Sequence, residues 1–307
     1  MLATVTLRDG RTLAYCEYGV KRNGESEKNA GDNLGEQRAT EQHRGPGSGG
    51  TSVLWFPGTP SSRLFVPPDT RRLAERGVRL IVVERPGYGC STPYPARTIL
   101  DWPNDVAELA DALHLDRFAV VGFSGGGPYA AACAYKLPAR VRRLVVIGAM
   151  APLDAPGVRS TLPMRGKLFL DLLGRHPRLA SSILRWLRPS PAEVQRAMVR
   201  HLAPCDHEAL AQEGVMERQI ALTAEALRSG YDVWIHEVGL AVRPWGFDLD
   251  GVSVETTLLW GANDRSTSLA MAHAYARIPR ARLRVVENAG HFVHLTNWDL
   301  VVDAMAE

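Results

Sequence analysis

A serine flanked by glycines offers the clearest chemistry in this chain. Ser124 lies in Gly122-Phe123-Ser124-Gly125-Gly126, which fits the pattern G-x-S-x-G between an apolar run typical of a strand and a stretch typical of a helix. A residue at the apex of such a sharp turn is held in a strained backbone conformation, and side chains two positions to either side would collide unless they were hydrogen atoms. The pattern therefore predicts a nucleophilic hydroxyl above the carboxyl end of a sheet, beside the free N–H groups of a helix N-terminus.

Such a serine needs two partners elsewhere in the chain. Its hydroxyl is a weak nucleophile at neutral pH until a histidine takes the proton, and a carboxylate must fix the tautomer of that histidine. Asp264 follows the predicted strand 256–260, and His291 follows the predicted strand 283–286. Because parallel strands end at the same edge of a sheet, these side chains can converge on Ser124. We therefore expect a triad of Ser124, His291 and Asp264.

Three other residues are candidates for these roles. Asp154 follows the predicted strand 144–148, but it heads a helical stretch, so we expect it to cap a helix. His294 lies three residues after His291, and we expect it to pack at the start of the last helix. Cys90 follows Gly89 in the loop after the fourth predicted strand, and we interpret it as a small side chain without a catalytic role.

The elements that must position these residues alternate between short β-rich runs and helical stretches, as in βαβ units. Strands are predicted at 4–7, 12–18, 53–56, 80–84, 118–122, 144–148, 256–260 and 283–286. Helices are predicted at 69–76, 102–113, 128–137, 269–278 and 298–306. Asp9-Gly10 is a hairpin signal between the first two strands, so the sheet should open antiparallel and continue parallel. The fold class is thus α/β, with an eight-stranded, mostly parallel sheet.

Two stretches interrupt this alternation. Residues 21–50 are rich in glycine and charge and hold only Leu34 as a large aliphatic residue, which predicts a disordered surface loop. Residues 152–241 are mainly helical and predict a helical cap inserted after the sixth strand. The sheet domain then comprises 1–151 and 242–307.

The predicted cap is rich in large apolar residues at helical spacing. Leu168, Leu172, Trp186 and Met216 are examples, and we expect most such residues to pack the cap against the sheet domain. A subset would line an apolar pocket for the substrate.

Composition narrows the functional class. The chain is 45% hydrophobic and 22% charged, as in ordinary globular proteins, and its 36 basic and 33 acidic residues leave a net charge of only +3, which gives no electrostatic case for nucleic acid. No signal peptide and no membrane-crossing run is recognisable. The four cysteines lack metal-ligand spacing and suggest a reducing compartment, so we expect a cytoplasmic protein without metal or cofactor.

Three stretches of the chain and one pair of stretches together resemble the α/β-hydrolase family. They are "FPGTPSSR", "ERPGYGCS", "GFSGGGP" and the pair "GANDR" with "AGHF", and their order and spacing match the family. The resemblance covers nearly all of the chain outside 21–50 and, weakly, the inserted cap. It implies that Ser124 is the nucleophile, that His291 is general base and then general acid, and that Asp264 orients His291.

The resemblance also implies an oxyanion hole. "PGTP", residues 57–60, resembles the H-G-x-P loop of the family but has Pro57 where the family has histidine. The oxyanion is held by backbone N–H groups, here those of Thr59 and Gly125, and a backbone donor survives the change at position 57.

The function implied by these features is hydrolysis of an ester or related acyl bond of a small molecule through an acyl-enzyme. The serine at the apex argues against dehalogenase and epoxide hydrolase chemistry, which would need an aspartate there. Carbon–carbon bond hydrolase, peptidase and thioesterase activities use the same triad and stay open. A non-hydrolytic cyclase or lyase and a small-ligand receptor are alternatives from another class. The oligomeric state is left open.

Overall fold

The protein is described by a computed structural model that covers residues 3–19, 50–162 and 164–307. The segment 20–49 lies outside the described residues, and with it nearly all of the predicted disordered loop. In the described part of the chain, eight strands form one sheet in the order β1-β2-β4-β3-β5-β6-β7-β8. β2 pairs antiparallel with both β1 and β4, and the remaining neighbours are parallel. This confirms the predicted fold class.

The strands lie close to their predicted positions. They are β1 Ala3–Thr6, β2 Thr12–Tyr18, β3 Thr51–Phe56, β4 Val78–Val83, β5 Phe118–Phe123, β6 Val141–Ile147, β7 Glu255–Gly261 and β8 Ala281–Val286. The predicted hairpin joins β1 and β2, with Gly10 in the left-handed region at φ +84°. β6 begins three residues earlier than predicted because Arg142 and Arg143 hide the apolar pattern at its start.

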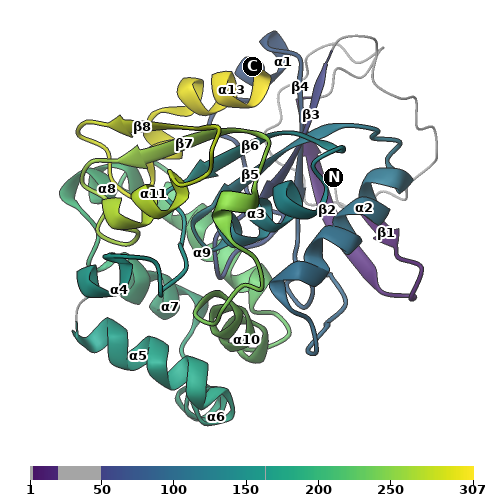
Figure 1. The fold of residues 1–307 in the computed structure, drawn as a ribbon. Helices are drawn as coiled ribbons and strands as arrows, with labels where there is room; N and C mark the ends of the chain where they lie inside the picture. The colour runs from purple at the N-terminus through teal and green to yellow at the C-terminus, as the bar shows by residue number, and fades with distance from the viewer. Residues whose placement is uncertain (1–2, 20–49, 163) are drawn as a thin grey trace.

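Helices cover both faces of the sheet (Figure 1). Outside the inserted segment they are α1 Thr70–Glu75, α2 Trp102–Ala112, α3 Gly127–Lys136, α11 Leu269–Tyr275, α12 Val293–Thr296 and α13 Trp298–Ala306. Side chains of α2, α3 and α11 pack on one face of the sheet, whereas those of α1 and α13 pack on the other. Successive residues of β5 point to opposite faces of the sheet. Val120 therefore packs in the hydrophobic cluster with α2, α3 and α11, and Val121 packs in the cluster with α1 and α13. A strand buried on both faces must be apolar throughout, as β5 is.

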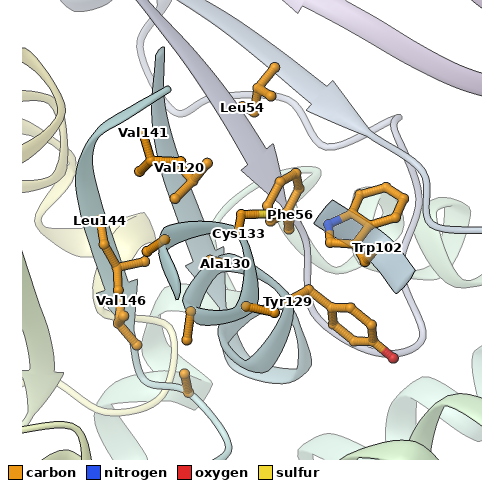
Figure 2. Close-up of a cluster of buried hydrophobic side chains, with 14 of the residues drawn as sticks. Leu54, Phe56, Trp102, Val120, Tyr129, Ala130, Cys133, Val141, Leu144 and Val146 are labelled. Carbon is orange, nitrogen blue, oxygen red and sulfur yellow. The ribbon is translucent and has the colours of Figure 1, made fainter. Parts of the chain in front are cut away.

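The hydrophobic cluster that contains α2, α3 and α11 fixes α3 on the sheet. Figure 2 shows Cys133 of α3 pointing to Phe56 of β3, and Tyr129 of α3 extending to the side where Trp102 of α2 lies. The ring of Trp102 meets Phe56 edge-on at 5.3 Å between centroids. Because Ser124 lies just before α3, this packing also fixes the position of the serine.

Seven α-helices among the described residues lie between β6 and β7. They are α4 Val158–Thr161, α5 Met164–Arg175, α6 Pro177–Leu187, α7 Pro191–Val199, α8 Pro204–Leu210, α9 Val215–Ala226 and α10 Asp232–Ala241. In Figure 1 most of them lie at the lower end of the molecule, and α1 and α13 lie at the upper end. Their position after the sixth strand is the one predicted for a cap.

The expected packing of apolar cap residues holds for only some of them. Met216 packs against a buried cluster that the inserted helices share with the sheet domain, whereas Leu172 packs against a cluster whose buried members all lie in the inserted helices. Leu168 and Trp186 are 63% and 81% exposed. The prediction was wrong for Leu168, Leu172 and Trp186 because spacing identifies an apolar helix face without showing what covers it. In α6 the residues turned inward are Ala180 and Ser181.

The described residues include neither a membrane-spanning helix nor a metal-binding group of side chains. No helix there has both the length and the apolar character to cross a membrane. No group of three or more His, Cys, Asp or Glu side chains in this part of the chain could hold a metal ion. The cytoplasmic location stays a prediction.

Candidate active site

Ser124 lies at the apex of a sharp turn between β5 and α3. The strand ends at Phe123, a single turn of 3₁₀ helix spans Ser124–Gly126, and α3 follows at once. The backbone of Ser124 has φ +51°, in the left-handed region that non-glycine residues rarely adopt. Such strain is stored where surrounding packing enforces it. The turn therefore exposes the Ser124 hydroxyl at the carboxyl edge of the sheet, as the sequence pattern predicts.

The two flanking glycines are required by close backbone contacts. A Cβ atom on Gly122 would lie 2.6 Å from the Cα atom of Gly127, and one on Gly126 would lie 2.1 Å from the carbonyl oxygen of Phe56. Real side chains do not tolerate such approaches. The predicted steric reason for glycine two positions to either side of the serine is confirmed.

The structure brings Ser124, His291 and Asp264 together. The Oγ atom of Ser124 lies 3.1 Å from Nε2 of His291, and Nδ1 of His291 lies 3.0 Å from Oδ2 of Asp264. Since a carboxylate only accepts hydrogen bonds, Nδ1 must carry a proton and Nε2 is left to accept the serine proton. His291 and Asp264 are both buried, which shields this chain of contacts from water.

Asp264 is held in place by its own loop. Its Oδ1 accepts hydrogen bonds from the backbone N–H groups of Ser266 and Thr267, each at 2.8 Å, and its Oδ2 accepts one from the Thr267 hydroxyl at 2.6 Å. Sequence reasoning missed Thr267, although an aspartate followed by Ser and Thr two and three positions later is typical of an Asx turn.

Burial and charge act in opposite directions on this pair. Burial raises the pKa of Asp264, but the charge of His291 and the hydrogen bonds from His291 and Thr267 outweigh it, so the pKa lies below its ordinary value. Burial lowers the pKa of His291, but the charges of Asp264 and Asp206 and the hydrogen bond to Asp264 outweigh it and raise this pKa above its ordinary value. The site thus favours an ionised aspartate and stabilises a protonated histidine.

A glycine after β6 makes room for the pair. Gly148 has φ +43°, and a Cβ atom there would lie 3.0 Å from Oδ2 of Asp264 and 3.5 Å from Nδ1 of His291. Sequence reasoning placed Gly148 at the end of a strand and assigned it no role. The glycine signal alone does not distinguish it from an ordinary turn residue.

The two predicted oxyanion-hole residues lie side by side. A Cβ atom on Gly125 would lie 3.3 Å from the backbone nitrogen of Thr59, and one on Gly58 would lie 3.3 Å from the Cβ atom of Ser124. The loop after β3 therefore lies directly against the serine. Donation from Thr59 and Gly125 to a substrate oxygen stays a prediction.

A buried arginine holds this loop from behind. The guanidinium of Arg85, just after β4, donates to the carbonyl oxygens of Pro57 at 2.7 Å and Gly58 at 3.0 Å and to the hydroxyl of Thr59 at 3.0 Å. Arg85 belongs to the stretch "ERPGYGCS", which resembles the family, but sequence reasoning assigned this arginine no role. Because the anchor uses backbone carbonyls, it does not need the histidine that Pro57 replaces.

Arg85 is in turn held by Glu237 of α10. One carboxylate oxygen of Glu237 accepts from Arg85, and the other accepts from Arg97 at 2.7 Å. Arg97 also donates to the hydroxyl of Tyr129 at 3.0 Å. The three charged side chains of this cluster, Arg85, Arg97 and Glu237, are buried. Sequence reasoning missed the cluster because its members are up to 152 residues apart.

His294 lies away from the serine and packs among aromatic rings. It belongs to α12, a short helix before the last one, and its ring centroid is 4.1 Å from that of Phe123 and 6.0 Å from that of Trp55. Burial, assisted by the charge of His291, lowers the pKa of His294 to about 3. A neutral imidazole in this setting has a packing role.

Asp154 and Cys90 are also apart from the triad. Asp154 is exposed in a turn, and the N-cap of α4 is Gly157, so the expected capping role of Asp154 was wrong. It borders a surface pocket of about 370 Å³ together with Trp245. The sulfur of Cys90 contacts the side chains of Glu225 and Arg228 instead of the catalytic residues.

Comparisons with known proteins give the same family. A family model described as "alpha/beta hydrolase fold" matches residues 46–297. The chain is 25% identical over 229 residues to a 2-hydroxy-6-oxononadienedioate/2-hydroxy-6-oxononatrienedioate hydrolase of Cupriavidus pinatubonensis, covering 72% of each chain. It is 30% identical over 206 residues to a 2-hydroxy-6-oxo-2,4-heptadienoate hydrolase of Pseudomonas putida, covering 63% of this chain and 64% of the other.

Solved structures agree at the level of the fold. A thermophilic esterase from Thermogutta terrifontis superposes with a TM-score of 0.69 at 22% identity, covering 99% of this chain and 96% of that one. A hydrolase from Pseudomonas aeruginosa gives the same TM-score at 19% identity, with the same coverage. The family model and the two relatives found by sequence support a hydrolase of this fold. Because the family model spans most of its length, the chain belongs to the alpha/beta hydrolase fold family.

Proposed function

We propose that this hydrolase cleaves an ester or related acyl bond of a small molecule through an acyl-enzyme on Ser124. The observation that carries the proposal is the unbroken chain of contacts from Ser124 through His291 to Asp264, at 3.1 and 3.0 Å. These distances lie in the range over which a general base takes a proton from a nucleophile.

In the acylation step, Oγ of Ser124 attacks the substrate carbonyl carbon while Nε2 of His291 takes the hydroxyl proton. Asp264 stabilises the imidazolium that forms and keeps its tautomer fixed. The carbonyl oxygen becomes an oxyanion, for which the backbone N–H groups of Thr59 and Gly125 are the proposed donors. One such donor contributes about 3 kcal/mol of transition-state stabilisation.

The tetrahedral intermediate then collapses and the leaving group departs with the proton from His291. In the second half of the reaction, water takes the place of the leaving group, and His291 removes a proton from it. The water oxygen attacks the acyl carbon and Ser124 regains its proton as the acid product leaves. No step needs a metal or cofactor.

A second candidate is hydrolysis of a carbon–carbon bond. The observation in its favour is that two relatives are named as hydrolases of 2-hydroxy-6-oxo-dienoate compounds, whose 6-oxo group is a ketone. The Ser124 hydroxyl, deprotonated by His291, would attack that ketone, and the carbon–carbon bond would break to release a stabilised carbanion that takes the proton from His291. The two candidates differ in the substrate and share the triad.

Covalent labelling with a fluorophosphonate probe tests the nucleophilic role of Ser124, which both candidate functions share. Ser124→Ala is expected to abolish labelling and to lower ester turnover about 10⁶-fold, as loss of the nucleophile does in serine hydrolases. Ser182→Ala, which changes an exposed serine on α6, is the matched control and should label like the wild type.

Turnover of two series of substrates distinguishes the two candidate functions. One is a chain-length series of p-nitrophenyl esters and the other is a series of 2-hydroxy-6-oxo-dienoates. Faster turnover of the dienoates would favour the second candidate. Labelling of Ser124 without turnover of either series would contradict both and favour a non-hydrolytic member of the fold.

A further inference from the structure

A buried carboxylate from the inserted helices contacts the backbone of the His291 loop. Asp206 lies in α8 and is 1% exposed. Its Oδ2 accepts a hydrogen bond from the backbone N–H of His291 at 2.9 Å, and its Oδ1 accepts one from the N–H of Phe292 at 2.8 Å. One side chain thus binds two successive amides of the loop that carries the proposed base.

The contact is tight as well as bidentate. A Cβ atom on Gly290 would lie 2.1 Å from Oδ2 of Asp206, so the loop backbone lies directly against the carboxylate. A Gly at this position permits the approach. Hydrogen bonds from amides to an ionised carboxylate are shorter and stronger than those between neutral groups. The position of His291 therefore depends on where α8 holds Asp206.

Asp206 also adds charge near the imidazole. Three titratable groups face His291 from the elements around it: Asp264 from the loop after β7, Asp206 from α8 and His294 from α12. His294 is neutral at the pH of catalysis, so the charges acting on the ring are both negative. Only Asp264 contacts the ring itself, whereas Asp206 acts from the backbone side.

We propose that Asp206 is a positioning residue of this hydrolase, which fixes the loop that carries His291 and adds a second negative charge beside the imidazolium formed during catalysis. The inference deepens the proposed function and rests on it. It makes the inserted segment a direct support of the triad, in addition to any part it has in covering the substrate.

The test compares two acidic residues of the same helix. Asp206→Asn keeps the size of the side chain but removes the charge and one acceptor. Glu208→Gln removes a charge from an exposed position two residues further along α8 and is the matched control. For each variant, kcat and KM for a p-nitrophenyl ester are measured from pH 5 to pH 9, with thermal melting as a check of folding.

For D206N we expect kcat to fall about tenfold to a hundredfold at nearly unchanged KM, because a small misplacement of a catalytic group costs up to about a hundredfold. We also expect the acid limb of the pH profile to move to lower pH. A negative charge that favours protonated His291 is lost, so its pKa falls. A purely structural role would not move this limb. E208Q should match the wild type in both readouts.

A variant that keeps the charge separates the two effects. Asp206→Glu is one methylene longer against a loop that leaves no space, so kcat should fall while the acid limb stays near its wild-type position. If D206N does not fold, D206E carries the test, and a wild-type kcat in D206E would overturn the proposal.

The outcomes distinguish this inference from the function on which it rests. A folded D206N that matches E208Q, in an enzyme whose Ser124 labels and turns over, would overturn the role of Asp206 alone. A wild-type protein that neither labels nor turns over would overturn the proposed function itself.

Discussion

The inserted helices support the site at two places, and they do so differently. On the histidine side, Asp206 of α8 binds two uncharged backbone amides. On the oxyanion side, Glu237 of α10 binds Arg85 and Arg97, and Arg85 binds the carbonyl oxygens of the loop beside Ser124. Both supports are buried carboxylates from the same insertion, yet the first has only amide partners and the second is paired with two cations.

The difference matches the charges that develop during acyl transfer. Around His291 the buried charges, Asp264 and Asp206, are negative, whereas the cluster behind the oxyanion loop holds two guanidinium groups and one carboxylate. The transition state places positive charge on the imidazole and negative charge on the substrate oxygen. Fixed charges of the opposite sign on each side stabilise it without reorganisation. We therefore expect changes beside His291 to move the pH profile, and changes behind the oxyanion loop to lower stability and turnover without moving it.

On the histidine side, the largest expected loss of kcat follows from a change at Asp264, and it should distinguish this residue from Asp206, the other carboxylate near His291. Asp264→Asn should lower kcat about 10⁴-fold, because an amide at this position favours the wrong tautomer of His291. This loss is far greater than the one expected for D206N, since only Asp264 contacts the ring.

Both variants share one signature in the pH profile. The pKa of His291 is raised above its usual 6.5, so the wild-type acid limb should lie above that pH, where the imidazole loses its proton and can act as a base. Removing either negative charge lowers this pKa, so the limb should move to lower pH in D264N as in D206N. Equal values of kcat in the two variants would remove the distinction between ring contact and loop support.

On the oxyanion side, loss of the Glu237 charge should lower the free energy of unfolding. Glu237→Gln leaves two buried arginines without their shared carboxylate, and breaking a buried ion pair in this way costs about 3–5 kcal/mol. Asp232→Asn on the same helix is the matched control. Its ion pair with Arg185 is more than half exposed, so the change should cost less than about 1 kcal/mol.

Urea unfolding measures both free energies, and kcat on the folded variants shows whether the loop has moved. We expect E237Q to lose turnover with its acid limb in place, because the change lies away from His291. A shift of the acid limb in E237Q would contradict the separation of the two sides.

The residues that carry the proposed chemistry were predictable, and the residues that support them were not. Ser124, Asp264 and His291 each follow a β-rich run, so strand ends at one sheet edge sufficed to bring them together. Asp206 differs in no local way from the exposed Glu208 on its helix, and its partners are 85 and 86 residues away. Arg85 and Glu237 are 152 residues apart. Their roles come from tertiary packing, which hydrophobic periodicity does not report.

The same limit applies to the inserted helices. The sequence predicted an insertion after the sixth strand, and α4 to α10 lie there. It did not predict that Trp186 would be exposed, nor that α8 and α10 would contact the loops of the triad. A helix face is readable from spacing, but its partner is a property of the fold.

The smallest expected effect concerns His294, which lies close to the triad without belonging to it. Its pKa of about 3 keeps it neutral throughout the pH range of catalysis, so it carries no charge that acts on His291. His294→Leu should leave the acid limb unmoved and kcat close to wild type, while the lost contacts with Phe123 and Trp55 cost about 1 kcal/mol of stability. His207→Leu, at an exposed position on α8, is the control for loss of an imidazole. The pH profile and urea unfolding measure the two quantities. A limb that moved in H294L would show that the charge around His291 is not set by the two carboxylates alone, and the contrast between the two sides of the site would then need a third group.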